Sequence, residues 1–86
     1  MNELLTYARM AEAHWREHCP RRVRDLERTG TLNGSLLEAQ NRTLDEMEQL
    51  MRDFRQQGLD PQQAHDQAWE MVRERYILIP PETAAS

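Results

Sequence analysis

The spacing of apolar residues in the first third of the chain is the feature that most constrains the fold. Seven of them recur at steps of three or four residues: Leu4, Ala8, Ala11, Trp15, Cys19, Val23 and Leu26. This spacing places them along one face of an α-helix, and the phase is the same before and after Pro20. We therefore expect helical structure with one buried stripe, against which the rest of the chain packs its own apolar faces.

Composition favours helices over sheets. The 86 residues fit a single domain with one modest core. Leu and Met dominate the large apolar side chains, β-branched and aromatic residues are few, and the polar residues are rich in Glu, Arg and Gln. The sequence therefore predicts an all-α fold, a small antiparallel bundle of three or four helical segments with a short extended C-terminal tail.

Charge and cysteine content restrict the compartment and the partners. The net charge is −4 with both signs mixed along the chain, so bulk charge does not favour nucleic acid. The single cysteine excludes an internal disulfide and fits a reducing compartment. Because no apolar run approaches the ~20 residues of a membrane span and no signal-peptide pattern opens the chain, we expect a cytoplasmic protein without membrane contact.

Proline and glycine predict the first helix boundaries. A helix capped by Asn2 should run to about His18, and Gly30 should end the segment that follows. Pro20 either kinks one continuous helix or begins a new helix after Cys19, and the sequence leaves both options open.

Two capping patterns predict the later helices. Ser35 and Glu38 have the spacing of a capping box, so we expect a turn over residues 31–35 and a helix from Leu36 to about residue 57, ended by Gly58. Asp60 and Gln63 form a second box around Pro61, which predicts a helix over residues 61–76.

The segment after the last helix is apolar and extended. Ile77, Leu78 and Ile79 cannot remain helical because Ile79 precedes a proline. The segment either packs back on the bundle or is offered to a partner. We expect a bundle domain over residues 1–79 and a flexible tail over residues 80–86.

One stretch carries a resemblance to a known family. The pattern of that family is L-x-E-H-x-P, an apolar helix, G-x-L-N and a Leu-rich acidic helix. The residues that match it here are Trp15, which stands at the leucine position, Glu17, His18, Pro20, Leu26, Gly30, Leu32, Asn33 and Leu37. The run from His14 to Leu37 resembles the small transposon-encoded proteins of the TnpV-type family. Cys19 and residues 76–82 lie outside that family's pattern. The resemblance implies no activity, only a context, which is an accessory protein of a transposon, prophage or similar element.

Two histidines invite comparison with metal sites. His14 and His18 stand one helical turn apart, next to Cys19, and His65 lies on a later helix. Zinc needs three or four converging ligands, whereas Cys19 is about 100° around the helix from His18. We therefore expect no metal and no cofactor. Because the chain has no nucleophile elbow, glycine-rich phosphate loop or HExxH motif, we expect no catalytic residues and no enzyme activity.

The main basic cluster is a candidate binding face. Arg21, Arg24 and Arg28 share a helix face away from the apolar stripe, where they could bind phosphates or an acidic protein surface. The alternative is a solvated face paired with acidic neighbours such as Glu17. Trp69 and Tyr76 are expected at the edge of the core, and either would be an interface anchor if exposed.

These observations favour a binding function. The candidate partner-binding residues are Arg21, Arg24, Arg28, Trp69, Tyr76, Ile77 and Ile79. We expect a non-catalytic protein–protein interaction module from a bacterial mobile element or phage, with inhibition of a host defence complex, as by anti-CRISPR proteins, as one role within that class. The alternative is a DNA-binding accessory protein or transcriptional regulator that uses the basic face from Arg16 to Arg28. A homodimer is a third option, because so short a chain has little apolar surface for a monomeric core.

Overall fold

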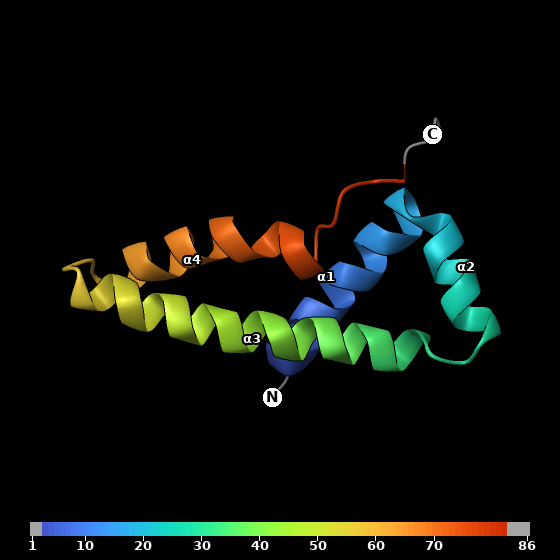
Figure 1. The fold of residues 1–86 in the computed structure, drawn as a ribbon, viewed down its shortest axis with the longest axis horizontal. Coiled ribbons are helices and arrows are strands. Elements are labelled where there is room, and N and C mark those ends of the chain that lie inside the picture. Colours follow the sequence, from blue (N-terminus) through green and yellow to red (C-terminus); the bar gives the residue numbers. More distant parts are fainter. Residues whose placement is uncertain (1–2, 83–86) are drawn as a thin grey trace.

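The computed structural model describes residues 3–82, with side chains from Thr6 onward, and this part of the chain forms four α-helices. They are α1 (Glu3–His18), α2 (Pro20–Arg28), α3 (Leu32–Gln56) and α4 (Pro61–Tyr76), followed by the non-helical residues 77–82 (Figure 1). The predicted all-α class is confirmed. The predicted cap at Asn2, the side chain of Leu4 and the tail residues 83–86 lie outside the described part.

The helices are spread in a thin layer. α3 and α4 form an antiparallel hairpin, α1 crosses α3 near its middle, and α2 leads from the end of α1 to the start of α3 (Figure 1). The molecule measures 45 × 33 × 15 Å, with a radius of gyration of 14.5 Å. A compact domain of this length would have a radius of gyration of about 12 Å. The hairpin therefore extends beyond the rest of the bundle. Among the described helices, none is long and apolar enough to cross a membrane.

Pro20 begins a new helix. Cys19 has φ −133° and ψ 56°, outside the helical region, and Pro20 occupies the first helical position of α2. Backbone hydrogen bonds still cross the junction, from Cys19 N–H to Trp15 O at 2.7 Å and from Val23 N–H to Cys19 O at 3.1 Å. Because these bonds preserve the register, the apolar stripe stays in phase on both sides of the proline.

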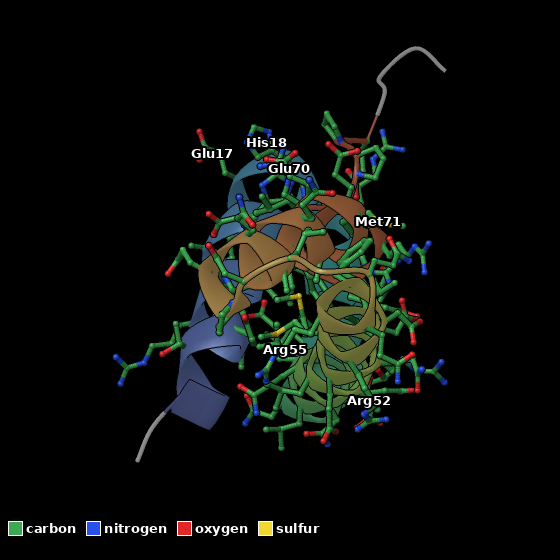
Figure 2. All side chains as sticks on the ribbon, turned by 90° about the vertical axis from the view of Figure 1, so that its left-hand side faces the viewer. Glu17, His18, Arg52, Arg55, Glu70 and Met71 are labelled. Carbon is green, nitrogen blue, oxygen red and sulfur yellow. The ribbon has the colours of Figure 1, made fainter. Side chains whose placement is uncertain are left out.

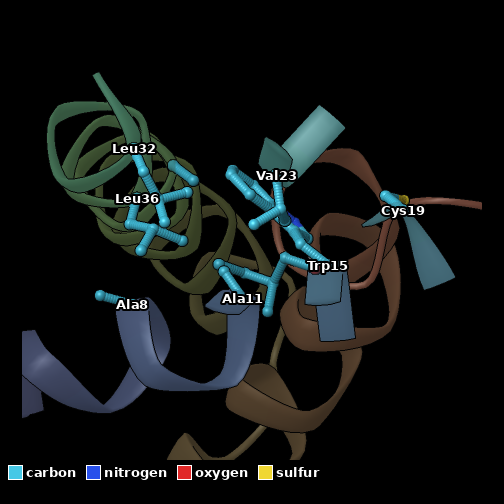
Figure 3. Close-up of a cluster of buried hydrophobic side chains, with 9 residues drawn as sticks. Ala8, Ala11, Trp15, Cys19, Val23, Leu32 and Leu36 are labelled. Carbon is cyan, nitrogen blue, oxygen red and sulfur yellow. Dashed lines mark hydrogen bonds between the residues drawn. The ribbon is translucent and has the colours of Figure 1, made fainter. Parts of the chain in front are cut away.

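The stripe forms the main core. Its members Ala8, Ala11, Trp15, Cys19 and Val23 are buried, and together with residues of α3 they form the cluster shown in Figure 3. Leu26 is only half-buried at the edge of this cluster. A second, smaller cluster joins α3 to α4 around Met47, Ala68 and Val72.

The predicted glycine stops are confirmed. Gly30 has φ 73° and Gly58 has φ 105°, both in the region that glycine enters without steric cost. After α2, Gly30 N–H bonds to Glu27 O at 3.1 Å and Thr31 N–H bonds to Leu26 O at 2.8 Å. This is a Schellman motif, and the same pair of bonds ends α3 around Gly58.

The predicted start of α3 is wrong. The helix begins at Leu32, so the expected turn over residues 31–35 does not form and Ser35 is inside the helix, its N–H bonded to Thr31 O at 2.9 Å. Leu32 and Leu36 lie one turn apart and are only 8 % and 5 % exposed. Burial of a leucine side chain is worth about 2 kcal/mol, which exceeds the roughly 1 kcal/mol that a helical Gly34 costs.

The capping box of α4 is confirmed. Gln63 N–H donates to the Asp60 carboxylate at 2.8 Å, and Asp60 N–H donates to the Gln63 side-chain oxygen at 3.1 Å. Pro61 occupies the first helical position, where its missing N–H costs nothing. This local signal therefore sets the start of the second arm of the hairpin.

The revised start of α3 predicts opposite effects of alanine at two glycines. Gly34 lies within the helix and a Cβ there would meet nothing within 4 Å, so Gly34→Ala should raise the free energy of unfolding by about 1 kcal/mol. Gly58→Ala should lower it by about 1–2 kcal/mol, because alanine is strained at positive φ. Urea titration followed by circular dichroism measures both. Destabilisation by Gly34→Ala would contradict the helical start at Leu32.

Candidate functional site

A groove lies between α1, α3 and α4. Its volume is about 860 Å³. Tyr7 of α1 and Leu44, Met47 and Met51 of α3 provide its apolar lining. Leu44, Met47 and Met51 are spaced three and four residues apart, so they share one face of α3. Met47 is buried, whereas Leu44 and Met51 are only half-buried and leave apolar surface in the groove.

The polar side of the groove carries a net excess of one positive charge. Glu48, Arg52 and Arg55 of α3 and His65 of α4 line it. Arg52 pairs with Glu48 at 3.4 Å, which leaves Arg55 as the further cation of α3 at this site. Figure 2 views the molecule from the hairpin end and shows Arg55 beneath the space that the three helices enclose. An acidic group entering the groove would therefore meet an arginine at its mouth.

Trp69 holds α4 against α1. Its ring stacks on that of Tyr7 with centroids 5.4 Å apart and planes inclined by 19°. Trp69 is half-buried and contacts both core clusters. This predicted partner-binding residue is thus an internal anchor beside the groove.

The predicted arginine face remains at the surface of α2. Arg21, Arg24 and Arg28 are exposed, and Arg28 pairs with Asp25. Nearby on α1, Arg16 bridges Glu12 at 2.9 Å and Glu27 at 3.2 Å; hydrogen bonding to Glu12 and then Glu27 raises the pKa of Arg16. Much of this surface therefore has the ion-paired character of a solvated face, and the groove does not include it.

The C-terminal segment packs on the bundle. Ile77 is fully buried in the main core, and its carbonyl accepts a hydrogen bond from Trp15 Nε1 at 3.1 Å. The Ile79 carbonyl lies 2.7 Å from His14 Nε2, and Ile79 itself is half-buried. Of the two alternatives left open by the sequence, the segment therefore packs back on the bundle. Ile77, predicted to contact a partner, has no exposed surface for that contact.

Glu82 caps α2 from the far end of the chain. Its carboxylate accepts hydrogen bonds from Arg21 N–H at 3.3 Å and Arg22 N–H at 2.9 Å, and its own N–H donates to His18 O at 2.9 Å. The N-cap residue Cys19 makes no side-chain cap bond, so Glu82 satisfies donors that a helix start leaves free. The domain boundary predicted at residue 80 is therefore too early, because Glu82 is part of the bundle.

His14 and His18 lie together, with ring centroids 4.4 Å apart. His14 Nε2 is bonded to the Ile79 carbonyl, and His18 Nε2 is 3.9 Å from the Glu17 carboxylate. Across the described residues, no group of three or more His, Cys, Asp and Glu side chains is arranged to hold a metal ion. The contact with Ile79 gives His14 a structural role at the C-terminal segment.

Tyr76 joins α4 to α3. Its hydroxyl donates to the Glu46 carboxylate, whose other oxygen bonds to Arg75 Nη1 at 2.6 Å. Hydrogen bonding to Glu46, followed by partial burial, raises the pKa of the Tyr76 hydroxyl above its ordinary value. Like Trp69, this predicted partner-binding residue makes its main polar contact inside the domain.

Comparison with protein-family models, curated proteins and solved structures found no match to this chain. The resemblance of residues 14–37 to transposon-encoded proteins therefore stays a prediction.

Removal of the Glu82 carboxylate should destabilise the protein. Glu82→Ala leaves the α2 donors uncapped, which should cost about 1 kcal/mol and lower Tm by roughly 4–8 °C. Glu74→Ala, which removes an exposed carboxylate of α4, is the matched control and should change Tm little. A thermal melt followed by circular dichroism measures both. Equal melting of the two variants would show that Glu82 does not act as a cap.

Glu46→Gln should lower the pKa of Tyr76 towards its ordinary value, because the hydrogen bond to the carboxylate is the largest cause of the rise. Tyrosinate absorbance, recorded against pH in a Tyr7→Phe background, isolates Tyr76. Since the folded-state pKa is the higher one, the bond stabilises the protein fully below the unfolded-state pKa and is lost as the pH rises through the folded-state pKa. Glu74→Gln should leave the titration unchanged.

Proposed function

We propose that the protein is a non-catalytic protein–protein interaction module, and that the groove between α1, α3 and α4 binds an apolar helix with acidic side chains from a protein partner. The observation that carries the proposal is the groove itself, with its methionine-containing apolar lining and arginine at its mouth. The lack of a catalytic motif in the sequence supports the non-catalytic part.

The shape and lining of the groove favour a helical occupant. Three helices border it, and an amphipathic helix laid into an apolar groove is a common mode of peptide recognition. Met51, which is half-buried, has a flexible, polarisable side chain that adapts to the shape of a bound surface. The molecule is only 15 Å thick in its shortest dimension, so the α3–α4 hairpin has an open side on which another helix can pack.

Charge indicates the chemistry of that helix. Glu48 compensates Arg52, whereas Arg55 leaves one net positive charge in the lining of the groove. Complementary charge raises association rates and suppresses wrong partners. We therefore expect acidic residues on the partner helix at the edge of its apolar face.

The biological setting is part of the proposal. The resemblance of residues 14–37 to transposon-encoded proteins supports an origin in a mobile element or phage. Within that setting, we propose inhibition of a host defence complex, as by anti-CRISPR proteins, as the first role to test. Small size and a binding surface without catalytic groups are compatible with such an inhibitor.

The test compares groove variants with a surface control. The protein is used to capture partners from the native host, and the affinity of the identified partner is then measured by calorimetry. Met51→Glu should weaken binding at least tenfold, because it places a charge in the apolar lining and adds repulsion against an acidic helix. Met71→Glu alters a methionine that is 47 % exposed and outside the groove, and should leave the affinity unchanged.

Other outcomes would redirect the proposal. If the wild type sediments as a dimer and Met51→Glu as a monomer, the groove is the interface of a homodimer. Equal partner affinity of wild type and Met51→Glu would exclude the groove as the binding site. Arg55→Ala should weaken binding and reduce its dependence on salt; an unchanged salt dependence would contradict the acidic partner.

A further inference from the structure

A second hollow lies where α2, α3, α4 and the C-terminal segment meet. Its volume is about 250 Å³. Three arginines from three different helices line it, namely Arg22 of α2, Arg42 of α3 and Arg75 of α4. Because these residues are far apart in the chain, their convergence is produced by the fold and is not the chance result of a basic run.

Each arginine is held in place by a neighbour. The Arg22 guanidinium lies over the Trp15 ring at 5.2 Å, Arg42 pairs with Glu38 at 3.0 Å, and Arg75 bonds to Glu46 at 2.6 Å. A guanidinium carries five N–H donors, so each of these contacts uses only part of its capacity. The hollow is therefore bordered by cations whose side chains are already oriented.

The charge balance of the lining is positive. Glu38 is the carboxylate of the lining and Glu46 is bonded to Arg75, so the three arginines exceed these two carboxylates by one charge. Ser35 and Tyr76 add hydroxyl groups, and Tyr76 also helps to raise the pKa of Arg42, after the larger effect of Glu38. Such a site attracts an anion that can accept several hydrogen bonds from different directions.

We propose that this arginine hollow binds a small oxyanion, either inorganic phosphate or the phosphate group of a small phosphomonoester. Arginine donors match phosphate and carboxylate oxygens. Three arginines that approach from three helices fit a tetrahedral group with at least three acceptor oxygens better than a planar carboxylate with two. The volume suits a single such group and is below that of sites for drug-sized ligands.

The site is separate from the groove. Its lining comes from the junction of the helices and shares no residue with the lining of the groove. Bound phosphate would connect α2 to the α3–α4 hairpin, and a ligand that binds only the folded state stabilises it. The two proposals are therefore tested independently. Absence of phosphate binding would not affect the proposed protein-binding function, and absence of partner binding would not affect the phosphate site.

The test is a phosphate titration of the 15N-labelled protein at constant pH and ionic strength, with chloride as the balancing anion. We expect saturable shifts of the side-chain N–H resonances of Arg22, Arg42, Arg75 and Trp15. Arg22→Gln and Arg75→Gln should each weaken binding at least fivefold. Arg24→Gln, on the same helix as Arg22 but outside the lining, is the matched control and should bind phosphate as the wild type does.

Two further arms complete the test. The same titration with phosphoserine distinguishes the two ligands. Tighter binding of phosphoserine than of inorganic phosphate indicates a phosphomonoester, and weaker binding indicates the free ion. Arg22→Lys keeps the positive charge but replaces the planar guanidinium and its several N–H donors by an ammonium group, and it should also weaken binding. Circular dichroism of every variant shows whether the fold is retained. Shifts that do not saturate, or that are the same in Arg75→Gln and Arg24→Gln, would overturn the proposal.

Discussion

The return of the chain after α4 to the corner between α1 and α2 is the constraint on which the rest of the structure depends. Ile77 fills the main core, and its carbonyl is bonded to the indole N–H of Trp15. Burial of these two side chains is worth roughly 2–3 kcal/mol each, more than a typical single hydrogen bond contributes. This contact fixes where α4 ends, and with it the position of the hairpin relative to α1.

The same return resolves a problem that Pro20 creates. A proline at the first helical position sets the backbone for α2, but the N–H groups of Arg21 and Arg22 still need acceptors, and the Cys19 side chain supplies none. Glu82 satisfies both of them from about sixty residues away, and its negative charge suits the positive end of the helix dipole. The proline break and the C-terminal segment are thus complementary parts of one arrangement.

How far the sequence predicts this fold depends on the range of each signal. Asp60 with Gln63, and the glycines at 30 and 58, act within a few residues, and the structure has them as predicted. The capping box predicted at Ser35 does not form, because burial of Leu32 in the main core, a contact with other helices, outweighs that local signal. The contacts of Glu82 with α2 and of Tyr76 with Glu46 join residues at least 30 positions apart, so no spacing rule could reveal them. For the same reason Trp69 and Tyr76, predicted as partner contacts, are found engaged inside the domain.

The groove follows from the way α4 packs on α3. Ala64, Ala68 and Val72 are fully buried and lie four residues apart on α4, which makes the seam of the hairpin narrow. Small side chains let two helices approach closely but cover little of the facing surface. The larger apolar residues of α3, Leu44 and Met51, are therefore left beside the seam, where they line the groove with Tyr7. The main core is thus filled by large side chains such as Trp15 and Ile77, whereas the hairpin seam is built on small ones and leaves apolar surface exposed beside it.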